Sequence, residues 1–448
     1  MKKQECKMCK RAGVFVAILC MAGTVSACGN NNSYDVDRTD GVGSDKNVNG
    51  ERGALAAQLD IPLSANEELS VDGTELKSIM IDDKDIIVPD KDWMYTKTYN
   101  MVEMTDSDKE KLIRSIFDED GGIYNYPQEY FDDIYISRDT VEEVFDDRDS
   151  KPDFGGEYFV GKIDGEPYVV RFMFGDGYIN KGFAVVPACL EEIPRELMDK
   201  SVTQVTYYDY NPDDVMEDDD TDSYGNGNQD QEMANSCGLD PDQAVQKAAE
   251  YMDKLGFLDV TETSVVDMYR AYEDDGFRVV KYEKDGYKVR FEASVNGVKI
   301  YQPISMAIDT MANKGSNPDN AVLAGNYFSE ISYYELSFNE NGILSFYGFF
   351  PMTAAGELER VDELIKWNDA VDGLRKAIPE HFQGYTGYSQ VVFNDVRLTY
   401  FRTMTENGQY EVIPVYVFSQ VEEYDTNQPI QLIMIDARDG SEVALFAE

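Results

Sequence analysis

A cysteine preceded by small residues offers the most recognisable chemistry in this chain. Residues 25–28, Val-Ser-Ala-Cys, have the form of a bacterial lipobox and follow 13 mostly apolar residues at 12–24, with five Lys or Arg residues before them. An apolar stretch this short is typical of a signal peptide, because spanning a bilayer takes about 20 residues. The pattern predicts that residues 1–27 are removed and that lipidated Cys28 anchors the chain at the extracytoplasmic face of the bacterial cell membrane. The alternative is an ordinary secretory signal with a chance cysteine.

The other cysteines offer less chemistry. Cys6 and Cys9 form a C-x-x-C, but both lie in the leader and would be removed with it. Beyond Cys28 the mature chain keeps Cys189 and Cys237, which could form a disulfide outside the cytoplasm. Such a bond needs the two Cα atoms within about 7 Å, and the sequence leaves this open.

Catalysis by a Ser-His-Asp or Cys-His arrangement would have to use His381, the one histidine of the chain. It follows Pro379 in a predicted helix-exit loop, without a nucleophile elbow or an H-x-x-x-H neighbour. We interpret it as a surface or C-terminal helix histidine. The 86 acidic residues could supply a pair of carboxylates for glycoside hydrolysis. With so many acidic residues, the presence of such a pair does not distinguish a hydrolase from a protein of another class. The sequence therefore predicts no catalytic residue.

Two acidic segments have part of the residue pattern of a calcium-binding EF-hand loop. From Asp220, position 3 is Asp222 and position 6 is Gly225, but Tyr224 and Gln231 fail at positions 5 and 12. The acidic residues at 35–41 miss by one residue of spacing. Glycines 225 and 227 follow no strand and open no helix, so they make no dinucleotide fingerprint. We therefore expect no metal site and no cofactor.

The charge of the chain restricts its partners. Removing residues 1–27, whose net charge is +4, takes the net charge from −46 to −50. This argues against a nucleic-acid partner, because phosphate binding needs clustered Lys and Arg. It also argues against electrostatic binding to an anionic membrane, so the N-terminal lipid would be the membrane contact.

Composition divides the mature chain. Residues 28–54 are polar and read as a flexible tether, and the acidic stretch 213–236 reads as a disordered linker. We expect an N-terminal domain at 55–212 and a C-terminal domain at 237–448.

In the N-terminal part, strands are predicted at 85–89 and 93–103. A helix is predicted from the cap at Thr105 to about residue 117. A hairpin at 157–163 and 167–174 turns at Asp164 and Gly165. The tyrosine-rich residues 207–210 and the segment 349–351 could be contact surface or core.

In the C-terminal part, Asp240, Pro241 and Gln243 predict a capped helix that ends at Gly256. Strands are predicted at 277–282, 287–293 and 298–302, separated by Asp-Gly at 285–286 and Asn-Gly at 296–297. A further pair at 331–338 and 343–350 turns at Asn-Gly 341–342.

A helix within 357–378, ended by Pro379, precedes strands at 390–402, 410–418 and 430–436. Helix followed by antiparallel strands thus occurs in 237–350 and again in 351–448, which favours a duplication. The pattern predicts an α+β fold with two or three units of antiparallel sheet and helices packed on one face.

Two of these strands carry a resemblance. Residues 413–418, Ile-Pro-Val-Tyr-Val-Phe, resemble the proline-aromatic strand of PepSY-like domains and YycH/YycI-type regulatory proteins. Residues 434–441 are similar to their closing strand and turn, although Tyr416 and Asp436 replace the commoner Trp and Asn. With the lipobox, the chain looks most like an uncharacterised lipoprotein family of clostridial bacteria. The resemblance implies an envelope protein that binds, inhibits or regulates, and carries over no catalytic residue.

We therefore expect a lipid-anchored, non-enzymatic module that binds a protein or peptide in the cell envelope. The alternatives are a lipoprotein that binds a small ligand or oligosaccharide, and an extracellular hydrolase that uses carboxylates.

Overall fold

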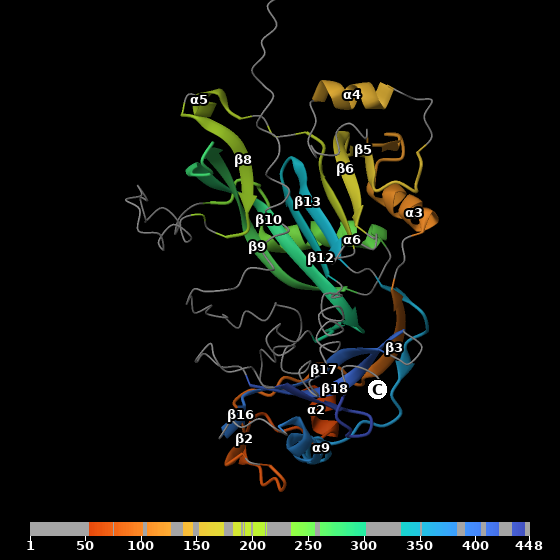
Figure 1. The fold of residues 1–448 in the computed structure, drawn as a ribbon, viewed down its shortest axis with the longest axis vertical. Coiled ribbons are helices and arrows are strands. Elements are labelled where there is room, and N and C mark those ends of the chain that lie inside the picture. Colours follow the sequence, from red (N-terminus) through yellow and green to blue (C-terminus); the bar gives the residue numbers. More distant parts are fainter. Residues whose placement is uncertain are drawn as a thin grey trace, which may run out of the picture.

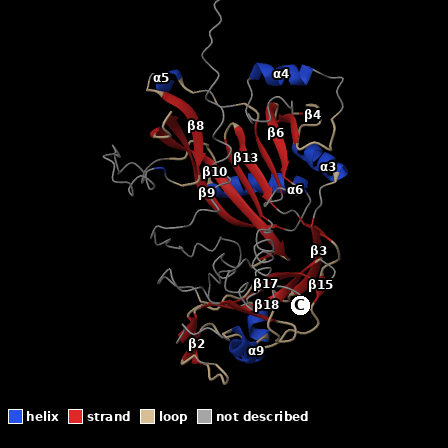
Figure 2. Ribbon diagram, in the orientation of Figure 1, coloured by secondary structure: helices blue, strands red, loops and turns tan. Residues whose placement is uncertain are grey.

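The computed structural model describes most of the chain: residues 53–74, 76–101, 105–126, 138–146, 152–173, 182–189, 191, 193–198, 200–210, 212, 234–255, 260–301, 333–349, 352–382, 390–404, 409–420 and 432–443. These residues form two lobes, each built around β-sheet (Figure 1). The upper lobe contains one ten-stranded sheet, and the lower lobe contains a six-stranded and a three-stranded sheet. Figure 2 shows that helices are few and lie around the sheets.

All strand pairs of the ten-stranded sheet are antiparallel. In spatial order its strands are β4 (Tyr124–Asn125), β5 (Tyr158–Ile163), β6 (Glu166–Met173), β7 (Gly182–Pro187), β13 (Gly342–Phe349), β12 (Tyr333–Asn339), β10 (Val279–Val295), β9 (Val260–Asp274) and β8 (Val202–Tyr208), with β11 (Val298–Lys299) beside β10.

Helices α3 (Asp106–Ile116) and α6 (Pro241–Leu255) cover one face of this sheet. Ile113 of α3 and Ala248 of α6 share a core with Phe172 and Phe291 of the strands. The opposite face is covered at its β4–β6 end by α4 (Arg138–Asp146), and a short helix, α5 (Arg195–Met198), precedes β8.

Local signals set the ends of these elements. The Thr105 hydroxyl accepts from the Asp108 N–H while the Asp108 carboxylate accepts from the Thr105 N–H, which closes a capping box. Asp240 and Gln243 form the same reciprocal pair before α6. Asp164 and Gly165, with φ of 53° and 85°, form the expected two-residue turn between β5 and β6.

The lower lobe combines both ends of the described chain. Its six-stranded sheet contains β14 (Met352–Ala354), β3 (Tyr95–Met101), β18 (Tyr410–Ser419), β17 (Asp395–Met404), β15 (Glu359–Arg360) and β19 (Leu432–Asp436). Its three-stranded sheet contains β1 (Ala65–Glu68), β2 (Ser78–Asp83) and β16 (Gln390–Phe393), with β2 and β16 parallel. Helices α2 (Ala54–Gln58) and α9 (Trp367–His381) join one core with these strands.

One strand connects the lobes. Val289 and Phe291 of β10 lie in the upper core, whereas Val295 of the same strand lies in the lower core. Beyond the β10–β11 turn, the Tyr301 N–H donates to the Tyr400 carbonyl of β17 (2.7 Å). Figure 1 shows β10 running from the ten-stranded sheet toward the lower lobe.

The α+β class is confirmed, with antiparallel or mixed sheets and few helices. The expected division at 213–236 needs correction, because strands pair across it. β8 pairs with β9, and β3 pairs with β18. Each large sheet therefore contains strands from both 55–212 and 237–448. The tether up to residue 52 and the linker at 213–233 lie outside the described residues.

Three local predictions in the C-terminal part were wrong. Asp285 and Gly286 do not separate two strands but form an irregularity within β10, where Gly286 has φ of 116°. α9 begins only at Trp367, because the apolar residues before it reach the core from an extended segment. Pro379 lies inside α9, which continues because the Phe382 N–H still donates to the Ile378 carbonyl.

Candidate functional site

Several residues singled out in the sequence lie outside the described part of the chain. They include Cys28 and the acidic segments at 35–41 and 220–231. Within the described ranges, no helix has the length and apolar character needed to cross a membrane. In the same ranges, no group of three or more His, Cys, Asp or Glu side chains is placed to hold a metal ion.

The possible disulfide between Cys189 and Cys237 is absent, because the two thiols are not bonded to each other. Cys237 is buried in the core beneath α6, whereas Cys189 packs against the α4 core on the other face of the sheet. The sheet thus lies between them. Burial raises the pKa of the Cys237 thiol.

His381 is the last residue of α9, so the interpretation as a C-terminal helix histidine is confirmed. The interpretation as a surface histidine is wrong, because the side chain is buried. Its Nδ1 lies 3.4 Å from Glu442 Oε1, and its ring meets the Phe382 ring edge-on. This setting is that of a packed helix end.

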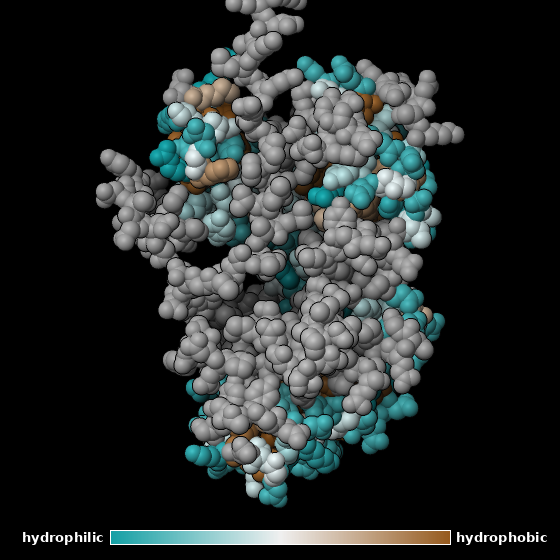
Figure 3. All heavy atoms as spheres, viewed as in Figure 1, coloured by the Kyte–Doolittle hydropathy of each residue, from teal (hydrophilic) through white to brown (hydrophobic). Residues whose placement is uncertain are grey.

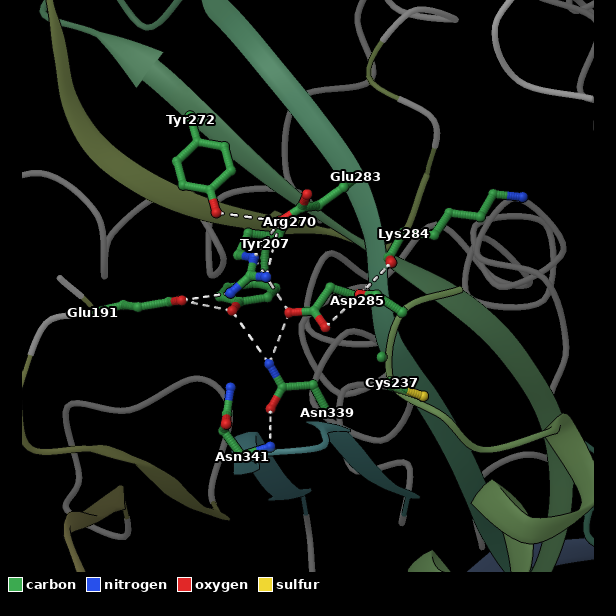
Figure 4. Close-up of polar contacts among 12 residues, drawn as sticks. Glu191, Tyr207, Cys237, Arg270, Tyr272, Glu283, Lys284, Asp285, Asn339 and Asn341 are labelled. Carbon is green, nitrogen blue, oxygen red and sulfur yellow. Dashed lines mark hydrogen bonds and ion pairs between the residues drawn. The ribbon is translucent and has the colours of Figure 1, made fainter. Parts of the chain in front are cut away.

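The most concentrated polar chemistry of the described residues surrounds Arg270 on β9 (Figure 4). We call this group the Arg270 cluster; its members are Glu191, Tyr207, Arg270, Tyr272, Glu283, Asp285 and Asn339. Strand register explains how they meet, since Arg270 lies opposite Tyr207 of β8 and opposite Glu283 of β10.

Three carboxylates surround the single guanidinium. The nitrogens of Arg270 lie 2.6 Å from Glu191 Oε1, 2.8 Å from Glu283 Oε1 and 3.3 Å from Asp285 Oδ2. Asp285 is 2% exposed and also accepts hydrogen bonds from Asn339 (2.9 Å) and from the Ser236 hydroxyl (3.0 Å). Glu191 and Glu283 are more open, with side-chain exposures of 36% and 29%.

These contacts move the pKa values of Arg270, Glu283 and Tyr272 further from neutral pH. Burial alone would lower the pKa of Arg270, but Tyr207 and the carboxylates outweigh it and raise the pKa. Burial would raise the pKa of Glu283, but Lys281 and Arg270 outweigh it and lower the pKa. Burial, together with Glu283, raises the pKa of Tyr272 to about 12.

A second group lies on the other face of β8 and β9. Glu273 is 1% exposed and accepts hydrogen bonds from three β8 side chains: Gln204 (2.5 Å), Thr206 (2.8 Å) and the Tyr208 hydroxyl. Three donors compensate the burial of this charge. Next to it, the Tyr208 ring contacts the Tyr210 ring, which is 44% exposed.

A third group continues along β10 and β12. Lys288 lies 2.7 Å from Asp209 and 3.3 Å from Glu335, and Arg290 lies 3.3 Å from Glu335. The Arg290 guanidinium also lies over the Tyr333 ring, 4.2 Å from its centroid. The three groups line both faces of the sheet at β8, β9 and β10, and we call this part of the molecule, with its two faces, the β8–β10 surface.

The sequence pointed to part of this surface only. The run 207–210 was expected to be either core or contact surface, and it is intermediate: Tyr207 and Tyr208 are partly buried in hydrogen-bonded groups, while Tyr210 is exposed. Of the run 349–351, no side chain is described. Arg270 was missed because β9 has apolar and polar residues on both faces, so period-two alternation is weak there.

The exposed large hydrophobic side chains of the described residues are dispersed over the molecule. In Figure 3 they lie in small areas among hydrophilic ones. The exposed large hydrophobic residues of the described ranges come from separate elements of both lobes: Leu63, Met198, Tyr210, Val266, Phe277, Val280 and Leu358.

Comparison with known proteins adds little. No family model matches the chain, and no curated protein matches it. It is similar to an uncharacterized protein from Eubacterium rectale ATCC 33656, known from a crystal structure at 1.45 Å resolution. The two are 14% identical over 86% of this chain and 94% of that chain, with a TM-score of 0.33, and a likeness at this level carries no argument about function.

Proposed function

We propose that this chain is a lipid-anchored protein at the extracytoplasmic face of the bacterial membrane, where it binds a protein or peptide partner without transforming it. The observation that carries the binding role is the β8–β10 surface, on which tyrosine, arginine and carboxylate side chains are partly exposed and fixed by one another. Tyrosine and arginine are enriched where proteins bind one another.

The fixed geometry favours binding. Arg270, Glu283 and Tyr207 each have partners within hydrogen-bond distance, so little side-chain freedom remains to be lost when a partner arrives. The pKa directions support the same role, because a general acid or base works best with a pKa near the operating pH. The pKa of Glu283 is lowered and the pKa values of Tyr207 and Tyr272 are raised, so all three lie further from neutral pH.

The location is supported by the lipobox at 25–28 and the short apolar segment before it. The net charge of −46 supports a partner that is not nucleic acid and favours one that carries basic groups.

Site-specific crosslinking on intact cells of the native host tests the binding role. A photo-crosslinking amino acid replaces Thr203 or Tyr210 on the β8–β10 surface and, as the control, exposed Ser70 in the lower lobe. We expect one protein species to crosslink from positions 203 and 210 and not from position 70. Equal crosslinking from all three positions would refute the assignment of this surface.

Fractionation of the same cells tests the location. The wild-type chain should sediment with membranes, and Cys28→Ser should release it into the medium or extracytoplasmic fraction. Equally firm membrane attachment of both would refute the lipid anchor.

A further inference from the structure

β8 occupies an unusual position in the ten-stranded sheet. It is the last strand of the sheet, and β9 is the one described strand that pairs with it. The opposite end of the sheet is closed by β4, which has only two residues. β8 has seven, so it is the longer of the two end strands.

The sequence of β8 lacks the usual protection of an edge strand. Edge strands are commonly shielded by proline, by lysine or other charges, or by a bulge. Residues 202–208, Val-Thr-Gln-Val-Thr-Tyr-Tyr, contain neither proline nor charge. The one irregularity lies at the beginning, between Val202 and Gln204, and the register from Gln204 to Tyr208 is regular.

Side chains on both faces hold β8 in place. Gln204, Thr206 and Tyr208 bind Glu273 on one face, and Tyr207 binds Glu191 on the other (2.7 Å). The strand is thus an ordered template before any partner arrives, which lowers the entropic cost of adding a strand.

The charges around β8 favour a basic occupant. Two cations beside β8 are already bound by more than one carboxylate each: Arg270 by three, and Lys288 by Asp209 and Glu335. Glu191 and Asp209 keep side-chain exposures of 36% and 42%. A second copy of a chain with a net charge of −46 would be repelled, whereas a lysine-rich segment would be attracted.

We infer that β8 is the docking edge for an extended, lysine- or arginine-bearing segment of a partner protein, which adds to the sheet as a further strand. This inference rests on the proposed binding function and names its mode. Main-chain hydrogen bonds along β8 would provide affinity, and basic side chains beside Glu191 and Asp209 would select the partner.

The probe is a fluorescein-labelled nine-residue peptide, Lys-Val-Lys-Val-Thr-Val-Lys-Val-Lys, with blocked ends, titrated with the mature ectodomain and followed by fluorescence anisotropy. Two further peptides are N-methylated at the odd or at the even positions, because a strand added to one edge uses the N–H groups of alternate residues. We expect one methylated set to lose at least about tenfold in affinity and the other to keep it. Equal loss or equal retention in both sets would overturn the inference.

A pair of charge reversals tests the place of binding. Asp209→Lys at the end of β8 should weaken binding at least about fivefold and reduce its dependence on salt. Asp253→Lys, at an exposed position of α6, makes the same change in charge and should leave binding unchanged. Equal effects of the two would overturn the location. Sedimentation at several concentrations checks the other occupant: a dimer lost in Asp209→Lys would assign the edge to a second copy.

The crosslinking on cells separates this inference from the proposed function. If the partner still crosslinks from position 210 in the Asp209→Lys variant at the wild-type yield, the binding function stands and the strand-addition mode fails.

Discussion

The guanidinium of Arg270 lies 3.3 Å from the carboxylate of Asp285, and the Asp285 residue is 2% exposed. These two residues come from neighbouring strands, β9 and β10, at the point where an irregularity shifts the register of the pair. Asp285 precedes Gly286, whose φ of 116° accommodates this irregularity within β10. The buried carboxylate therefore depends on Arg270, Asn339 and Ser236 for compensation.

Replacing Arg270 with methionine should destabilise the upper lobe. The change keeps an apolar stem but removes the cation shared by three carboxylates, and leaving a buried charge without its partner costs about 3 kcal/mol. Urea unfolding followed by circular dichroism measures the loss. Arg278→Met is the matched control, because the Arg278 side chain is 79% exposed and its pair with Asp274 is screened by solvent, so its loss should change stability little. Equal losses in both variants would show that Arg270 does not stabilise the cluster.

Glu283→Gln should change how stability depends on pH. The pKa of Glu283 is lowered in the folded protein, so its ionised form contributes stability above its ordinary pKa, which is about 4.3. That contribution is lost as pH falls through the lower folded pKa. At pH 7 the wild type should therefore unfold at a higher midpoint concentration of urea than Glu283→Gln. The difference between the two midpoints should shrink below about pH 4. A difference that grows on acidification would contradict the lowered pKa.

Signals between neighbours in sequence predicted local structure well. Thr105 with Asp108 and Asp240 with Gln243 begin helices through hydrogen bonds within four residues, so the sequence alone reveals them. The turn at Asp164 was found for the same reason. At Asp285 the same kind of signal misled, because an Asp-Gly pair also suits a bulge within a strand.

Relations between distant residues could not be predicted. In the parallel pairing of β2 with β16, Ile79 lies opposite Val391. The sequence of neither segment indicates which strand will be its partner. The Arg270 cluster depends on the same kind of relation, since Glu191 approaches Arg270 across 79 positions of sequence. Composition at 213–236 suggested a domain boundary, but strand pairing is decided by the strands on either side of it and not by the connection between them.

Several tyrosines should titrate late. Burial raises the pKa of one group of tyrosine hydroxyls to about 12, and the group consists of Tyr168, Tyr251, Tyr272, Tyr301 and Tyr333. Because the folded pKa is raised, the stability they contribute is fully present below their ordinary pKa of about 10 and is lost as pH rises through about 12. Ultraviolet difference absorbance should show an early and a late step, with native circular dichroism lost during the late one. One step near pH 10 with the native spectrum retained would contradict this.

Tyr334 lies in the upper core, and its hydroxyl is buried with no hydrogen-bond partner among the described residues. A buried hydroxyl without a partner costs free energy, so removing it with Tyr334→Phe should leave the free energy of unfolding unchanged or raise it by about 1 kcal/mol. Tyr168→Phe makes the same chemical change at a hydroxyl that donates to the Ile343 carbonyl (2.9 Å), and it should cost about 1 kcal/mol. Urea unfolding should therefore show a lower free energy of unfolding for Tyr168→Phe and an unchanged or higher one for Tyr334→Phe. A loss for Tyr334→Phe as large as that for Tyr168→Phe would mean that the Tyr334 hydroxyl has a partner in the folded protein, such as a buried water.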